Sequence, residues 1–225
     1  MGLGHSPRIV TDGLVLCLDA ANKRSYPVSG TTWTDLTGGN NGTLTNGPTF
    51  NSENSGSIVF DGTNDYVDVS GTASLNAPIS TDITISTWIY ITKNNAWQGV
   101  ITKNRSTTTQ VGLFLSSSNQ FVFGFSGSSG NLIGSSFSTN IWYHVVVVQK
   151  ANTNRKIYLN GSLDAIKTSS FGTTSSGSET FRLGQATGVN EYFGGRISNA
   201  MIYFNKALTA DEVRQNYEAT KERYI

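Results

Sequence analysis

The chain has 225 residues, of which Gly, Ser, Thr and Asn supply 99, while charged residues make up only 14%. This composition excludes coiled coils and helical bundles, and the 37% of hydrophobic residues is enough for a folded core. A net charge of +1 without a basic run argues against a nucleic-acid partner. No apolar run approaches the roughly 20 residues of a membrane span, so no membrane partner is expected either.

The beginning of the chain differs from the rest. Residues 1–12 contain Gly2, Gly4 and Pro7 and show no strand or helix pattern. We therefore predict an N-terminal arm over residues 1–12 and a single domain over residues 13–225, a length that one all-β domain commonly reaches. The start also lacks the apolar stretch of a signal peptide, so we expect no export by that route.

Strand patterns follow one another through the domain. Each is a run of β-branched and aromatic residues that ends at Gly, Asn, Ser or Asp, which is typical of an all-β protein. Residues 83–91 and 142–149 carry apolar side chains on both faces, so they should lie inside a sheet that is covered on both sides. The expected strands are residues 13–19, 57–60, 66–69, 83–91, 99–103, 111–115, 120–125, 142–149, 155–159, 180–183 and 195–204.

Polar stretches separate these strands. Residues 20–56, 126–140 and 167–179 have few large apolar groups, so we expect loops there. Two dipeptides that reach positive φ at little cost, Asp61 with Gly62 and Asn160 with Gly161, predict tight turns.

One helix is expected, over residues 210–223. Thr209 can cap its N-terminus, and Glu212, three residues later, can reach back in a capping box. Val213, Tyr217 and Thr220 then lie on the stripe that should dock on the domain.

Several segments resemble successive signatures of laminin G-like domains. Residues 58–69 read IVFDGTNDYVDV, and they are followed by ITISTWI at 83–89, WYHV at 142–145 and IYLNG at 157–161. The end, FGGRISNAMIY at 193–203 with LTADEV at 208–213, resembles the closing strand and helix of that family. The resemblance spans residues 13–219 in the order of the family. It implies a concanavalin A-like jelly roll of two antiparallel sheets packed face to face, with one short C-terminal helix.

A second resemblance concerns the early part of the domain. DGLVLCLDAAN at 12–22, SYP at 25–27 and WTDL at 33–36 are similar to a subgroup found in virion proteins of tailed bacteriophages. It implies a virion protein that folds in the bacterial cytoplasm, with which the single cysteine agrees. Its partners would be other virion proteins or copies of itself, contacted through the arm.

Catalysis is not expected. Glucanases of this fold resemble one another in a Glu-x-Asp-x-Glu strand that pairs the carboxylates of a retaining glycosidase, and this chain has no such strand. A serine or cysteine nucleophile would need a base. The only histidines are His5, in the arm, and His144, in a strand where we expect a packed structural residue.

Two loops are candidates for glycan binding. Trp97 lies in a polar loop, and Tyr192 lies beside Asn190 and Glu191. Sugars have apolar ring faces and hydroxyl edges, which aromatic rings beside amide and carboxylate groups recognise. The alternative is that both aromatic residues only anchor their loops.

Calcium is the one inorganic ligand that the sequence leaves open. Asp61, Asn64 and Asp65 lie within five residues of a turn and offer oxygen ligands. The resemblance implies the same, since several laminin G-like domains bind calcium at the rim of the sandwich. The alternative is a turn in which these side chains bond to nearby backbone.

Two functions follow from these patterns. The first is a non-enzymatic virion structural protein, a head decoration, fibre or tail-associated subunit that acts through protein contacts. The alternative is a lectin-like adhesion module that binds a cell-surface glycan, with or without calcium. Assembly through residues 1–12 favours the first, and glycan binding by an isolated monomer favours the second.

Overall fold

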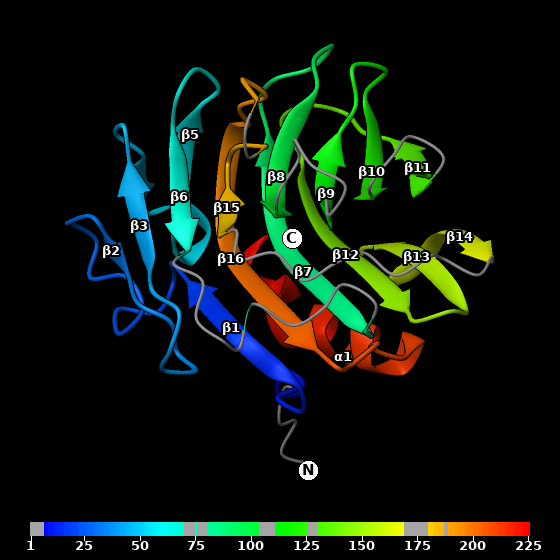
Figure 1. The fold of residues 1–225 in the computed structure, drawn as a ribbon. Helices are drawn as coiled ribbons and strands as arrows, with labels where there is room; N and C mark the ends of the chain where they lie inside the picture. The colour runs from blue at the N-terminus through cyan, green and yellow to red at the C-terminus, as the bar shows by residue number, and fades with distance from the viewer. Residues whose placement is uncertain are drawn as a thin grey trace.

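Two antiparallel sheets packed face to face form the protein, as the computed structural model shows (Figure 1). It describes residues 7–69, 75, 81–103, 111–125, 130–168, 180–186 and 189–225. Within these residues a single α-helix, α1 (Ala210–Thr220), follows the last strand. The all-β sandwich with a short C-terminal helix that the sequence predicts is thus confirmed.

The first sheet, sheet A, has the strand order β14-β13-β12-β7-β16-β5-β4, and β1 also pairs with β16. Its strands are β1 (Leu14–Asp19), β4 (Thr49–Asn51), β5 (Ser57–Asp61), β7 (Ile83–Ile91), β12 (Trp142–Lys150), β13 (Asn154–Leu159), β14 (Ser162–Thr168) and β16 (Gly194–Phe204).

The second sheet, sheet B, has the order β11-β10-β9-β8-β15-β6-β3-β2, which Figure 1 shows from right to left. Its strands are β2 (Thr32–Trp33), β3 (Gly42–Thr45), β6 (Tyr66–Val69), β8 (Gln98–Lys103), β9 (Val111–Leu115), β10 (Gln120–Phe125), β11 (Leu132–Ser136) and β15 (Phe181–Leu183). The edge strands β11 and β14 meet at one side of the sandwich, where Ser135 N donates a hydrogen bond to Asp164 Oδ2 at 2.8 Å.

The core fills the space between the sheets. Alternate residues of each strand point inward, so Ile85 and Ile89 of β7 belong to the same core cluster as Leu113 and Phe121 of sheet B, and all four are fully buried. Because of this alternation, the other side chains of each strand point to the outer faces of the two sheets.

The outer face of sheet A is covered too. Trp88 of β7 stacks on Tyr217 of α1 and on Tyr224, with ring centroids 5.8 Å and 4.1 Å away. His144 of β12 packs in the same stack, and its Nε2 lies 3.1 Å from Ser86 Oγ. Burial lowers the pKa of His144 to about 3. Its expected role as a packed strand residue is confirmed, and so is the double burial of β7 and β12.

Part of the predicted arm joins this covering layer. Val10 is buried; its N–H donates to Asn216 Oδ1 at 2.8 Å, and its carbonyl accepts from the Tyr203 hydroxyl at 3.0 Å. Gln215 Nε2 donates to the Arg8 carbonyl at 2.6 Å. Residues 8–10 therefore pack on α1 and β16, whereas residues 1–6 lie outside the described part.

The helix begins as predicted. Thr209 Oγ1 accepts from Glu212 N at 3.2 Å, and Glu212 Oε2 accepts from Thr209 N at 2.8 Å, which is the expected capping box. The expected helix 210–223 is α1 followed by a 3₁₀ turn, Lys221–Arg223. Among the described residues, no helix has the length and apolar character needed to cross a membrane.

Two predicted loops were wrong. Residues 20–56 contain β2, β3, β4 and a 3₁₀ turn, Glu53–Ser55, and residues 126–140 contain β11. The strand β14 was missed as well. These strands are short or lie at sheet edges and are rich in Thr, Ser and Gly, so pairing with a neighbour, rather than an apolar alternation, makes them strands. Of the third expected loop, residues 169–179 lie outside the described part.

One buried carboxylate holds the early segment onto β1. Asp35 accepts hydrogen bonds from the N–H groups of Cys17 at 2.8 Å and Asn40 at 3.0 Å, and from Thr37 and Gly39. Burial would raise the pKa of Asp35, but the hydrogen bonds outweigh it and hold the pKa below its usual value.

Asp35→Asn should therefore destabilise the protein by about 2 kcal/mol at pH 7, since an amide cannot accept all these bonds. The folded-state pKa lies below the unfolded value, so this contribution is present above about pH 4 and is lost as the pH falls through the folded pKa. Urea unfolding from pH 7 to pH 2 should show the difference from the wild type shrinking. A difference that stays constant would contradict this role, and Asp12→Asn at an exposed carboxylate is the matched control.

Candidate functional site

In the part of the chain that the structure describes, the outer face of sheet B is open at strands β3, β6 and β15. Tyr66 and Asp68 of β6 alternate with two fully buried valines, and Arg182 of β15 stands between two fully buried apolar residues. These three side chains therefore point away from the core and are only half-buried.

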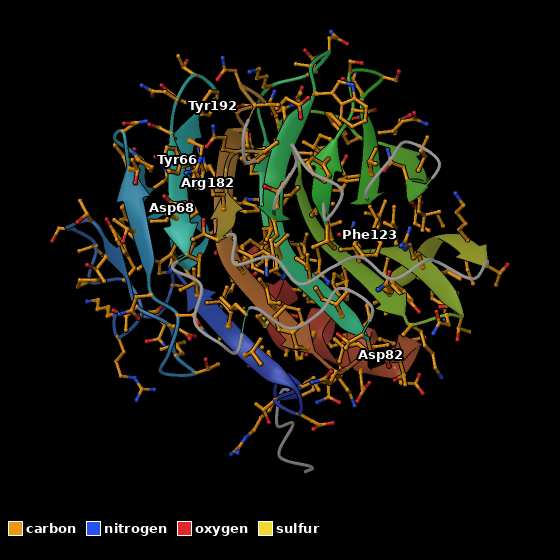
Figure 2. The ribbon with its side chains drawn as sticks, in the orientation of Figure 1. Tyr66, Asp68, Asp82, Phe123, Arg182 and Tyr192 are labelled. Atoms are coloured by element: carbon orange, nitrogen blue, oxygen red, sulfur yellow. The ribbon has the colours of Figure 1, made fainter. Side chains whose placement is uncertain are left out.

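Arg182 is the centre of this cluster. Its Nε lies 2.7 Å from Asp68 Oδ1, its Nη1 donates to Gln185 Oε1 at 2.7 Å, and its guanidinium carbon lies 4.4 Å from the centroid of the Tyr66 ring. Figure 2 shows Tyr66, Asp68 and Arg182 together, with Tyr192 beyond them at one end of the strands. The Asp68/Arg182 pair and the Tyr66 ring thus place a carboxylate, a guanidinium and an aromatic ring next to one another on one surface.

Threonine hydroxyls extend this surface across the sheet. Thr32 pairs with Thr43, Thr43 with Asp68, and Asp68 with Arg182, so one polar row crosses β2, β3, β6 and β15. Both threonines are exposed. Beyond Arg182 the row continues to Thr102, which is fully buried, so the accessible part ends at β15.

The two predicted glycan-binding loops come together at the end of this face. The Glu191 carbonyl accepts hydrogen bonds from Gly99 N at 3.0 Å and Ala186 N at 3.1 Å. Gln185, which holds Arg182, also pairs with Tyr192 in an isolated β-bridge. The rim segment 189–192 is therefore tied both to β8 and to the Asp68/Arg182 pair.

Trp97 anchors this rim and remains partly accessible. It packs with Val189 against Phe114, Val122 and Ala186 on the outer side of sheet B. Its ring is half-buried, as is Tyr192, while Asn190 is exposed. The structure therefore places Trp97, Asn190, Glu191 and Tyr192 at one end of the same surface.

Asp61, Asn64 and Asp65 form a turn held by its own side chains. Asp61 Oδ1 accepts from Thr63 N at 2.7 Å and Asn64 N at 3.2 Å, and Asp65 Oδ2 accepts from Asp61 N at 3.0 Å. The hydrogen bond from Thr63 N lowers the pKa of Asp61, while burial raises the pKa of Asp65.

A lysine joins this turn to the rim. Lys93 Nζ donates to the Gly62 carbonyl at 2.8 Å and lies 3.4 Å from the Tyr192 carbonyl. In the part of the chain that the structure describes, no three His, Cys, Asp or Glu side chains are grouped to hold a metal. Calcium needs six to eight oxygen ligands. Asp61 Oδ1 and Asp65 Oδ2 accept hydrogen bonds within the turn, as the alternative expects, and calcium at this turn stays a prediction.

The central residues of the face, Tyr66, Asp68, Arg182 and Gln185, were not singled out from the sequence. The alternation of YVDV at 66–69 places Tyr66 and Asp68 on the same face, so the sequence alone could have predicted that these two side chains lie together. Their meeting with Arg182 depends on the pairing of β6 with β15, which no local pattern gives.

A pocket of about 600 Å³ lies elsewhere, between residues 7–11, β1, β16 and the end of α1. Three charged residues line it: Arg8, Asp19 and Arg223. Asp19 and Arg223 are paired with each other, with both carboxylate oxygens 3.0 Å from Nη1. Its wall residues include the buried Cys17 and Met201, which pack beneath the covering layer.

Residues 61–214 match the family model described as the Concanavalin A-like lectin/glucanases superfamily. This match confirms the concanavalin A-like part of the resemblance. The similarity of residues 12–36 to phage virion proteins stays a prediction. No curated protein sequence matches the chain.

Solved structures share the fold at low sequence identity. Trypanosoma rangeli sialidase is 16% identical over 96% of this chain, with a TM-score of 0.73. The ligand binding domain of botulinum neurotoxin serotype D, in complex with N-acetylneuraminic acid, is 18% identical over 92% with a TM-score of 0.72. The binding domain of Paraclostridial Mosquitocidal Protein 1 is 19% identical over 91% with a TM-score of 0.69.

This chain spans only part of those proteins, covering 34% of the sialidase, 51% of the neurotoxin domain and 52% of the mosquitocidal protein domain. At these identities the likeness is one of fold.

The close approach of the rim segment to β8 requires Gly99. A Cβ there would lie 2.2 Å from Ala186 N and 2.5 Å from the Gln185 carbonyl carbon. Gly99→Ala should push residues 185–186 away and lower the free energy of unfolding by about 1 to 3 kcal/mol. Thermal unfolding and amide hydrogen exchange measure this. Gly39→Ala, with open space around its Cβ, is the control, and equal behaviour of the two variants would refute the requirement.

Proposed function

Because the chain belongs to the concanavalin A-like lectin/glucanase superfamily, we propose that it is a non-enzymatic carbohydrate-binding protein displayed on the virion of a tailed bacteriophage. Its binding surface is the outer face of sheet B together with the rim segment 189–192. The observation that carries this proposal is the cluster of Tyr66, Asp68 and Arg182 on the outer face of sheet B, over which no helix of the described residues lies.

The chemistry of this face suits a sugar. The Asp68 carboxylate accepts hydrogen bonds from hydroxyl groups, and the N–H groups of Arg182 not used by Asp68 or Gln185 donate to hydroxyl oxygens. The half-buried rings of Tyr192 and Trp97 offer flat apolar surfaces to the C–H face of a pyranose. Structural neighbours solved in complex with sialic acid and N-acetylneuraminic acid support carbohydrate as the ligand class.

Several features support binding without catalysis. His144, the histidine of the domain, is fully buried with a pKa lowered to about 3 by burial, so it is a poor base near neutral pH. Asp68 is committed to Arg182.

The virion setting rests on the similarity of residues 12–36 to phage virion proteins, which assemble in the host cytoplasm. Exposed apolar side chains at the edge of the sandwich agree with contacts to neighbouring subunits. Ile133 of β11 and Leu163 and Ile166 of β14 are 55%, 52% and 51% exposed. These subunits would be other virion proteins or further copies of this chain.

Glycan binding is tested with Tyr66→Ala in the full chain. Removing the ring that orients Arg182 should weaken binding to any glycan found on an array by about tenfold, which isothermal titration measures. Tyr90→Ala is the matched control, because it removes the same kind of ring on the outer side of sheet A. The Tyr90 ring centroid lies 5.0 Å from the guanidinium carbon of Arg196, and Arg196 pairs with Glu53 as Arg182 pairs with Asp68. An equal loss in both variants, or no glycan bound by the wild type, counts against the proposed site.

The assembly role is tested by removing residues 1–6. The deletion stops there because Val10 is part of the packed domain. Light scattering and co-sedimentation with particles of the source phage should show association of the full chain and its loss in the shortened one. A full chain that stays monomeric and does not sediment with particles would refute the virion role while leaving glycan binding open.

A further inference from the structure

The cation at the proposed binding face is already paired. Arg182 turns one edge of its guanidinium to Asp68, with Nε 2.7 Å from Oδ1 and Nη2 3.5 Å from Oδ2, and Nη1 donates to Gln185 Oε1. The ring of Tyr66 covers one side of its plane. Arg182 is thus held in place, and its charge is balanced by a neighbouring carboxylate.

This arrangement disfavours an acidic sugar. A carboxylate is held best by a guanidinium that offers two parallel N–H groups. Here Asp68 takes that edge and would repel a second carboxylate brought to the same place. At the rim, Lys93 is engaged by the Gly62 and Tyr192 carbonyls, so its ammonium is also committed.

The same arrangement favours neutral hydroxyl groups. Asp68 is 34% exposed, so its oxygens retain lone pairs that point to solvent, and Arg182 is 23% exposed and retains N–H donors beside them. The Asp68 acceptor beside the Arg182 donor matches two hydroxyl groups on adjacent carbons of a sugar, because each hydroxyl group can both donate and accept a hydrogen bond. The exposed hydroxyls of Thr32 and Thr43 continue this pattern along the row.

Resting on the proposed function, we infer that the site selects neutral hexoses through a pair of vicinal hydroxyls and discriminates against sialic and uronic acids. The structural neighbours solved with sialic acid are 16 to 18% identical to this chain, and a likeness at that level shows the fold and not the choice of sugar.

The test compares glycans that differ only in the acid. The full chain is titrated with a galactose-terminated oligosaccharide, its sialylated counterpart and an oligosaccharide that ends in glucuronic acid. We expect binding of the neutral sugar at least about tenfold tighter than that of either acidic one. Equal or tighter binding of an acidic glycan would overturn the selectivity while leaving glycan binding intact. If neither class binds, the proposed function itself fails.

A pair of variants locates the selectivity. Asp68→Asn releases Arg182, so binding of the acidic glycans should rise at least about tenfold relative to the neutral one. Glu53→Gln makes the same change in charge and releases Arg196, which lies over Tyr90, on the other sheet. It should leave the ratio unchanged. If Asp68→Asn keeps its melting temperature and its ratio of acidic to neutral glycan affinity is unaltered, the inference is also overturned. If that variant does not fold, the comparison of glycans on the wild type still decides the inference.

Discussion

The stacking of Trp88 on Tyr217 and Tyr224 is the contact on which the arrangement of the molecule depends. It fixes the C-terminal segment over sheet A, and Trp88 Nε1 adds a hydrogen bond to Thr220 Oγ1 at 2.8 Å. Residues 8–10 then complete the cover through Asn216 and Tyr203. Since this layer lies on the outer face of sheet A, the outer face of sheet B at β3, β6 and β15 is the more open sheet surface among the described residues.

The sequence carries the parts of the fold that local chemistry decides. The capping box at Thr209 sets the start of α1, and the apolar character of both faces in residues 83–91 and 142–149 already predicts a doubly covered sheet. Short edge strands such as β3 and β11 escaped prediction because their Thr, Ser and Gly residues have no apolar alternation of their own. Their conformation comes from the neighbouring strand, which a local pattern does not include.

The candidate site likewise has one part that the local sequence predicts and one part that only strand pairing brings together. Trp97 and the residues 190–192 were found from the local sequence, because an aromatic residue among polar neighbours can be recognised along the chain. Asp68 and Arg182 are 114 residues apart, and only the pairing of β6 with β15 brings them together. The carboxylates at Asp61 and Asp65 looked like metal ligands in the sequence, but in the structure their oxygens accept hydrogen bonds from the backbone of their own turn.

One surface thus links the rim loops to a paired charge cluster. A crystal structure of the full chain with a bound oligosaccharide is the most direct test that this surface is the binding site. We predict a sugar ring with its hydroxyls against Asp68 and Arg182 and with Tyr192 beside it. A sugar seated instead in the pocket between residues 7–11 and the end of α1, with the face of sheet B left bare, would contradict the account.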